Sequence, residues 1–396
     1  MVIQGKTEIN GLRWQWLVVA AVYAIALLAG YILIGQVWPP HAARTWLTIT
    51  AAAMAVQLAI LWWALPSNHP NGAQTPFRTL GYANALTLGR GLLTSLMAGF
   101  FFGPAPLGWL AWVPALLYAL ERLVDFGDGY VARVTGRETR LGEILDIEYD
   151  GLGILVAVGL AIQYGKLPPW YLLLGLGRPL FVAGMWLRHR RGLPVYDLPP
   201  SDQRRVIAGF QTGFVALTLW PLLSPTVTQL SSYFFAVPLI FSFGRDWLVV
   251  SGVLDPASPS YQRVRRQGKL LVEGWLPLVA RIAGAALAAL LLAQAMPAGV
   301  ASLLPGLPAL LTFGMVALWM AAAAAMLLGA AGRIAAAGLF TLACWQMQAA
   351  GLDWTNGMLL ACTIFVAHLG SGRLALWRPE ERFLHTKLGT PRPHTS

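Results

Sequence analysis

The chain is poor in charge and almost without cysteine. Only 11% of its 396 residues are charged, whereas 57% are hydrophobic. So little charge excludes a soluble globular protein of this length. Cys344 and Cys362 lie inside apolar runs with no partner or ligand spacing, which argues against a disulfide framework or a zinc site. The two cysteines are expected to be packing residues.

Histidine is also scarce, and its positions exclude a histidine metal site. The six histidines are scattered and form no metal-binding pair at helical spacing. Any metal must then be bound by oxygen atoms, which suits magnesium or manganese.

Long apolar runs recur from end to end of the chain. They predict an all-α fold, a polytopic transmembrane helical bundle with about twelve spans. The expected helices lie near residues 14–35, 45–65, 82–103, 108–133, 143–163, 169–187, 205–224, 232–252, 272–296, 307–331, 334–350 and 356–372. The first run, Trp14 to Ile34, is too long for a signal peptide and lacks a cleavage pattern, so we interpret it as a membrane helix.

The net charge of +11 comes mostly from loops between the expected spans. With both termini in the cytoplasm, only Arg44 and Lys166 fall in outside loops, as the positive-inside rule requires. We therefore expect an integral protein of a bacterial cytoplasmic membrane and no nucleic-acid partner. Polar linkers near 66–80 and 254–271 divide the chain into residues 1–79 with two helices, a six-helix core at 80–253, and residues 254–396 with four further helices and a basic tail.

Four aspartates and a few small residues form one spaced pattern within the core segment. Its positions are Asp125, Asp128, Gly129, Ala132, Arg133, Gly142, Asp146 and Asp150. Carboxylates in or beside membrane helices are costly, by roughly 2.5–3.5 kcal/mol each, so four of them need a compensating partner. On helices, the first five positions fall within about 140° and the last three within about 80°. A polar turn between Arg133 and Gly142 would bring the two faces together on the cytoplasmic side.

Converging carboxylates predict a metal site for phosphate chemistry. Two divalent cations roughly 3.5–4 Å apart would neutralise the aspartates and clamp a diphosphate. The small residues let a nucleotide or a neighbouring backbone approach. The guanidinium of Arg133 can donate two hydrogen bonds to one phosphate group.

The spacing D-x2-D-G-x2-A-R-x8-G-x3-D-x3-D resembles the full signature of the CDP-alcohol phosphotransferase family, and all eight positions match. Upstream, Asn84, Thr87 and Arg90 are similar to the stretch that opens the first core helix in that family. The resemblance covers about residues 80–252 and leaves both flanks unexplained.

The resemblance implies roles for each matched residue. Asp125, Asp128 and Asp146 would be metal ligands, and Asp150 would be both a ligand and the general base. Gly129, Ala132, Arg133 and Gly142 would line the nucleotide pocket. The implied cofactors are two divalent cations, Mg²⁺ or Mn²⁺. A homodimer through the core helices is left open, because related enzymes often dimerise there.

The implied reaction belongs to phospholipid biosynthesis. An acceptor hydroxyl attacks the lipid-side phosphorus of CDP-diacylglycerol or a similar CDP-linked lipid, and CMP leaves. A phosphorylated polyol such as glycerol 3-phosphate or inositol phosphate is the preferred small alcohol acceptor, with serine or an uncharged alcohol next. The preference comes from arginines that flank a Pro-rich loop, namely Arg188, Arg190, Arg191, Arg204 and Arg205. These arginines serve equally well as topology signals.

Two further charged positions have open interpretations. Arg178 falls inside an expected span, where an arginine usually faces a cavity or pairs with an acid. Arg245 and Asp246 are interpreted as a local ion pair rather than part of an acceptor pocket.

The alternative function is a membrane transporter or lipid-binding protein on the same fold, although the flanking spans carry only isolated acids. A degenerate scaffold is disfavoured because no signature residue is missing.

Overall fold

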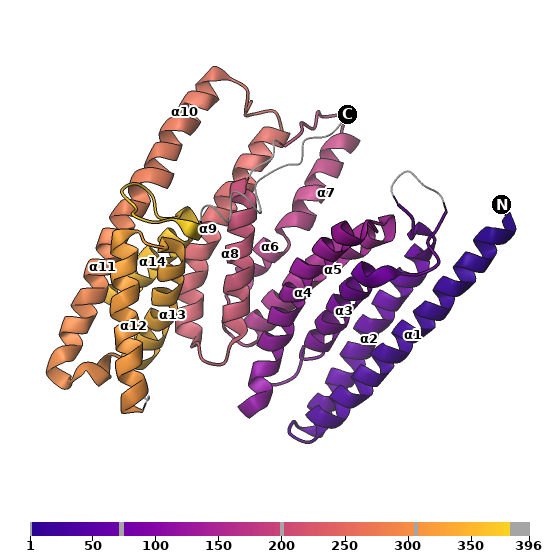
Figure 1. Cartoon of the computed structure of the whole chain (residues 1–396), viewed down its shortest axis with the longest axis horizontal. Helices are drawn as coiled ribbons and strands as arrows, with labels where there is room; N and C mark the ends of the chain where they lie inside the picture. Colours follow the sequence, from indigo (N-terminus) through magenta and orange to yellow (C-terminus); the bar gives the residue numbers. More distant parts are fainter. Residues whose placement is uncertain (1, 71–74, 199–201, 305–307, 381–396) are drawn as a thin grey trace. The chain divides into compact units, whose positions relative to one another are not determined.

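The computed structural model describes residues 2–70, 75–198, 202–304 and 308–380, and the named elements in these ranges are helices (Figure 1). The α-helices are α1 (Val2–Gly35), α2 (Pro40–Ala64), α3 (Gly81–Ala98), α4 (Val113–Thr135), α5 (Arg140–Gln163), α6 (Leu172–Gly175), α7 (Gly177–Arg190), α8 (Asp202–Leu219), α9 (Pro225–Val250), α10 (Pro259–Lys269), α11 (Leu276–Ala295), α12 (Ala309–Leu328), α13 (Gly332–Ala350) and α14 (Trp354–Leu369). The prediction of an all-α fold is confirmed. The expected basic tail lies largely outside the described residues.

The helices form two compact units. The first unit is Met1–Leu176 with Val215–Pro221, and the second is Gly177–Phe214 with Leu222–Ser396. The division predicted at residues 79 and 253 was drawn from hydropathy and polar linkers, and it stays a prediction. The segment 254–271, predicted to be a polar linker, contains helix α10.

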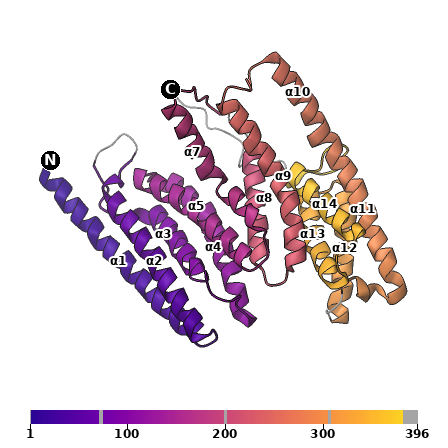
Figure 2. The ribbon, with the colours of Figure 1, turned by 180° about the vertical axis from the view of Figure 1, so that it is seen from behind.

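In the first unit, α3 is the central helix of the part that carries the aspartates. It packs against α2, α4 and α5, whereas α4 and α5 pack on α3 far more than on each other. Figures 1 and 2 show α1 and α2 side by side at one edge of this group. Buried leucines from several helices form its core, including Leu61, Leu88, Leu141 and Leu145.

The turn between α4 and α5 is short because both helix ends are capped. Gly136 ends α4 in a left-handed conformation with φ of 63°, which glycine adopts without strain. Thr139 begins α5, and its Oγ1 accepts a hydrogen bond from the backbone N–H of Gly142 at 3.0 Å. The predicted polar turn is therefore confirmed, and it sends α5 back along α4.

In the second unit, α11 to α14 share one hydrophobic core. Trp319 is buried there, and its indole N–H donates to the carbonyl of Ala288 at 3.2 Å. Cys344 is buried as a free thiol, as is Cys362, which confirms their expected role as packing residues. Arg281 is also buried and donates to the carbonyls of Met326 and Leu327, which are left over at the end of α12.

Five helices in the described residues are long and apolar enough to cross a membrane. They are Asn10–Gly35, Pro40–Ser67, Pro225–Val250, Pro259–Ala298 and Leu310–Leu328. A sixth span results if Pro169–Gly175 and Gly177–Arg190 form one broken helix. About twelve spans are thus not confirmed. The helix expected at 169–187 is interrupted at Leu176, and α4 and α5 carry too many charges to qualify by composition.

Packing between α1, α2 and α3 depends on glycines that accommodate a large indole. Trp46 of α2 is 2% exposed, and its Nε1 donates to the carbonyl of Leu96 at 3.1 Å. A Cβ at Gly30 would lie 2.5 Å from Cη2 of this ring, and one at Gly99 would lie 2.6 Å from Cδ1. Any side chain at these positions would force the ring to move.

We therefore expect Gly30→Ala to destabilise the protein by about 1–3 kcal/mol through overpacking against Trp46. Gly35→Ala is the matched control, because a Cβ there meets no atom within 4 Å. Thermal unfolding in detergent measures both variants. Equal melting temperatures for the two would contradict this account of the Trp46 contact.

Candidate metal centre

Helix α4 places its acidic residues on one face. Glu121, Asp125 and Asp128 follow one another at spacings of four and three residues, which brings them to the same side of a helix. Glu121 and Asp128 are buried, and Asp125 is half-buried. The hydroxyl of Thr87 on α3 donates a hydrogen bond to Oδ2 of Asp128 at 3.0 Å and so holds that carboxylate in place.

Helix α5 supplies the other two aspartates, one turn apart. Asp146 is 57% exposed and Asp150 is 40% exposed at their side chains. Near the start of the helix, a Cβ at Gly142 would lie 2.8 Å from Oδ1 of Asn84. Gly142 thus allows α5 to approach α3 closely, which is a packing reason for a glycine that the sequence assigned to a nucleotide pocket.

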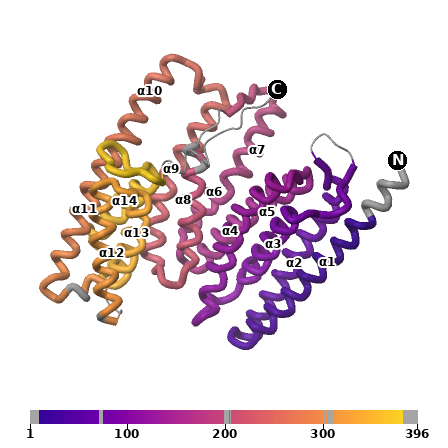
Figure 3. The backbone as a smooth tube through the Cα atoms, viewed as in Figure 1, coloured from indigo at the N-terminus to yellow at the C-terminus, as the bar shows by residue number. Residues whose placement is uncertain are grey.

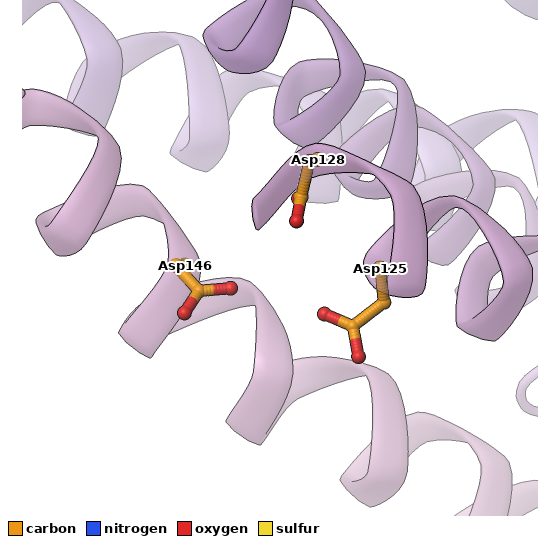
Figure 4. A group of neighbouring side chains, drawn as sticks. All are labelled: Asp125, Asp128 and Asp146. Atoms are coloured by element: carbon orange, nitrogen blue, oxygen red, sulfur yellow. The ribbon is translucent and has the colours of Figure 1, made fainter. Parts of the chain in front are cut away.

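Three of the four predicted aspartates converge. Asp125, Asp128 and Asp146 each offer one carboxylate oxygen, and these oxygens all lie within 4.8 Å of one another. Figure 4 shows Asp125 and Asp128 on one helix and Asp146 on the neighbouring helix, with the carboxylates around a common space. Asp150 lies one turn beyond Asp146 and is not part of this triplet.

The guanidinium of Arg90 lies among these acids. This side chain of α3 is fully buried, and its Nη1 is 3.0 Å from Asp128 Oδ2 and 2.8 Å from Asp146 Oδ1. Nη2 is 2.6 Å from Asp125 Oδ1. Asp150 is more distant, at 3.8 Å from Nη2. One cation thus joins carboxylates from α4 and α5 to α3.

A second cation, mostly but not fully buried, accompanies the fourth aspartate. Arg122 on α4 donates to Oδ1 of Asp150 at 2.7 Å and pairs closely with the buried carboxylate of Glu121. Glu121 also lies 3.4 Å from Nε of Arg90. The sequence reasoning missed Glu121 and Arg122. Their signal was present in the spacing, because Glu121 precedes Asp125 by one helical turn on the acidic face.

The cluster carries more negative than positive charge. Its five carboxylates and two guanidiniums leave a formal charge of −3. Carboxylate oxygens are hard donors that magnesium and manganese prefer. An excess of negative charge on convergent oxygens is what a divalent cation neutralises, so the donor set fits such an ion.

The remaining motif residues continue along α4 from the carboxylates toward its carboxyl end. The backbone N–H of Gly129 donates to Asp128 Oδ1 at 2.6 Å. A Cβ at Gly129 would lie 3.2 Å from Nη1 of Arg133, so the arginine extends back over the glycine. Ala132 is half-buried and Arg133 is exposed. Their role in a nucleotide pocket stays a prediction.

The arginines considered for the acceptor belong to the second unit, and several bind protein groups there. Arg188 donates to the carbonyls of Pro194 and Ser251 at 3.0 and 3.1 Å. Arg204 lies 3.4 Å from Asp246, whose other oxygen is 3.5 Å from Arg245. The predicted Arg245–Asp246 ion pair is thus confirmed and extended.

The other basic positions differ in their surroundings. Arg190 lies over the ring of Trp186, with Cζ 4.2 Å from the ring centroid. Arg178 is exposed at the second residue of α7. The side chain of Arg205 lies outside the described residues.

Comparisons with known proteins agree with the motif. Residues 80–244 match the CDP-alcohol phosphatidyltransferase family. A relative from Cereibacter sphaeroides, the CDP-diacylglycerol--glycerol-3-phosphate 3-phosphatidyltransferase, is 34% identical over 80 residues, which are 19% of this chain. The match spans 36% of that protein's length, about a third of it. No solved structure matches the chain. Residues 80–244, which contain the whole carboxylate cluster, are therefore a domain of the CDP-alcohol phosphatidyltransferase family.

Proposed function

We propose that the protein is a phosphatidyltransferase of phospholipid biosynthesis. It transfers the phosphatidyl group of CDP-diacylglycerol, or of a similar CDP-linked lipid, to an alcohol and releases CMP. One observation carries the proposal: three carboxylate oxygens within 4.8 Å of one another, from the aspartates of the motif, lie inside the segment that matches the family.

The proposed cofactors are two divalent cations, Mg²⁺ or Mn²⁺. Asp125, Asp128 and Asp146 would hold them, with Asp150 as a further ligand at the exposed side of the cluster. When bound, such ions stabilise the charge that develops on the diphosphate and on the departing CMP. The formal charge of −3 on the cluster supports the proposal, because two divalent ions would exceed it by one positive charge and leave the site attractive to a diphosphate.

Arg90 and Arg122 then act as positioning residues for the acids. Arg90 holds carboxylates of two helices at 2.6 to 3.0 Å, so it sets the spacing of the prospective ligands. Arg122 holds Oδ1 of Asp150 at 2.7 Å. Guanidiniums already held in such contacts lose little further side-chain entropy when a substrate binds, which favours a preorganised site.

In the proposed reaction, Asp150 accepts the proton of the acceptor hydroxyl. The oxygen of that hydroxyl forms a bond with the lipid-side phosphorus, and the bond from this phosphorus to the bridging oxygen of the diphosphate breaks. CMP leaves with the bridging oxygen. Asp150 is partly exposed, as a base that meets a soluble acceptor must be. Arg133 and the small residues Gly129, Ala132 and Gly142 would bind the CDP group.

The preferred acceptor is a phosphorylated polyol such as glycerol 3-phosphate or inositol phosphate. The name of the relative from Cereibacter sphaeroides supports this choice, because glycerol 3-phosphate is its stated acceptor. The sequence also favours it, because guanidiniums such as those of Arg190 and Arg191 donate hydrogen bonds to phosphate oxygens.

We further propose that the acidic helices are membrane-embedded, with the cluster on the cytoplasmic side of a bacterial cytoplasmic membrane. Helices α4 and α5 have 23 and 24 residues, and helices of that length extend about 35 Å, enough for the roughly 30 Å hydrocarbon layer. Counting them brings the total nearer to the twelve spans and six-helix core that hydropathy predicted. A homodimer through the core helices remains part of the proposal.

The decisive experiment is CMP release by the purified protein from CDP-diacylglycerol, with Mg²⁺ or Mn²⁺ and a panel of acceptors. Release that depends on one acceptor names the substrate. Absence of release with every acceptor and metal, from a protein with a normal melting temperature, would contradict the transferase and favour transport or lipid binding on the same fold.

Replacement of the proposed base supplies the first prediction. Asp150→Asn should lower acceptor-dependent CMP release by about 10²–10⁴-fold, since the amide accepts no proton. Asp255→Asn is the control, because Asp255 is an exposed aspartate between α9 and α10. Comparable activity of the two variants would remove Asp150 from the role of base.

A ligand variant supplies the second prediction. Mn²⁺ should raise the melting temperature of the wild-type protein, and Asp146→Asn should weaken that rise, because the amide lacks the charge of the carboxylate. Asp146 is chosen because its side chain is 57% exposed and because the amide oxygen of asparagine still accepts the hydrogen bond from Arg90. Thermal unfolding during a Mn²⁺ titration measures the effect without any substrate. An unchanged Mn²⁺ dependence in the variant would exclude Asp146 as a ligand.

A further inference from the structure

Helix α10 is an exposed basic extension of a membrane helix. It continues through a π-helical turn, Leu270–Trp275, into α11. Together they form one helix over Pro259–Ala298, basic in α10 and apolar in α11 (Figure 3). These 40 residues correspond to about 60 Å of helix, twice the roughly 30 Å of hydrocarbon in a bilayer. The 20 residues of α11 fill that thickness alone, so α10 must extend beyond it.

Side chains at the junction mark the level of the membrane surface. Trp275 is half-exposed at the start of α11, and the guanidinium of Arg373 lies 4.8 Å from its ring centroid. The backbone N–H of Arg373 also donates to the carbonyl of Gly274 at 3.1 Å. Tryptophan and arginine together are typical of the boundary between hydrocarbon and headgroups. The membrane surface therefore lies near Trp275, and the carboxyl end of α10 at Lys269 is six residues, about 9 Å, beyond it.

The charges of α10 gather on one side. Arg263, Arg265, Arg266 and Lys269 fall within about 160° of the helix circumference, whereas Tyr261, Val264 and Gly268 fall within about 60° of the other side. The four basic side chains are exposed, and the helix contains no acidic residue. Lys269 is paired, with Glu273 at 3.5 Å. We name Arg263, Arg265, Arg266 and Lys269 the basic collar.

Tyr261 ties this helix to the rest of its unit. Its hydroxyl accepts a hydrogen bond from Nε of Arg245 on α9 at 3.0 Å. Ser258 caps the helix, with its Oγ accepting from the backbone N–H of Tyr261 at 3.3 Å. The collar is thus carried on an ordered helix and not on a loop.

We propose that the basic collar binds the anionic headgroups of phospholipids in the membrane that α11 crosses. Along the helix axis, Lys269 lies about 9 Å and Arg263 about 18 Å from the level of Trp275, so the collar lies one to two Debye lengths of about 8 Å from the edge of the hydrocarbon and begins next to the headgroups, which occupy roughly 5–8 Å beyond that edge. Charge complementarity and the continuity with α11 favour a lipid over a soluble polyanion, because the membrane surface is already adjacent. The inference does not rest on the proposed transferase activity.

The test uses the full-length protein reconstituted in equal amounts of phosphatidylglycerol and phosphatidylcholine, then extracted with its bound lipid. The ratio of the two co-purified lipids measures selectivity. The fourfold variant R263Q/R265Q/R266Q/K269Q should lose roughly threefold or more of the preference for phosphatidylglycerol. The matched control R263K/R265K/R266K keeps the charge and should keep the preference.

A salt titration of the wild-type protein tests the same contact without mutation. The preference should fall as NaCl rises from about 50 to about 500 mM, because exposed charges are screened. The proposal would be overturned if the fourfold glutamine variant kept the wild-type melting temperature, the wild-type orientation in the membrane and an unchanged lipid ratio. The collar would then be a topology signal. If that variant fails to fold, a wild-type lipid ratio that does not respond to salt overturns it as well.

Discussion

The buried guanidinium of Arg90 is the interaction on which the first unit is organised. Arginine keeps its charge in any protein environment, and a buried charge without partners costs several kcal/mol. Here the partners come from two other helices, Asp125 and Asp128 on α4 and Asp146 on α5, at 2.6 to 3.0 Å. Each acid would repel the others without this cation, and the cation would be untenable without the acids. The packing of α3 against α4 and α5 and the positions of the carboxylates therefore depend on each other.

This mutual dependence explains why α3 occupies the centre of the site. The turn at Gly136 and the cap at Thr139 return α5 along α4, but these two helices pack mainly on α3. Gly142 lets α5 approach Asn84, and Thr87 fixes Asp128. The surrounding polar groups of α3 thus hold the carboxylates while leaving Asp146 and Asp150 partly exposed.

The second unit follows a different principle. Its helices α11 to α14 bury small residues and one large tryptophan, Trp319, in an apolar core. The buried Arg281 binds leftover backbone carbonyls and not carboxylates. A guanidinium serves a structural end in this unit, whereas in the first unit it organises acids. Helix α10 of the second unit carries four exposed basic side chains and no acid, outside the length that a membrane requires.

The sequence by itself determined the helical class, the membrane character and the position of the acidic cluster. Each depends on local pattern: apolar runs exceed the length of a span, and the aspartates repeat at helical spacing. Sequence also predicted the polar turn between Arg133 and Gly142, which depends on residues close together in the chain and which the structure shows capped by Gly136 and Thr139. Long-range contacts are not encoded in such patterns. Only the tertiary structure placed Arg90 among the aspartates, gave Asp150 a separate partner in Arg122, and drew Glu121 into the cluster. Their positions follow from the way α3 packs against α4 and α5, since a buried charge is acceptable only where another helix brings its counter-ion.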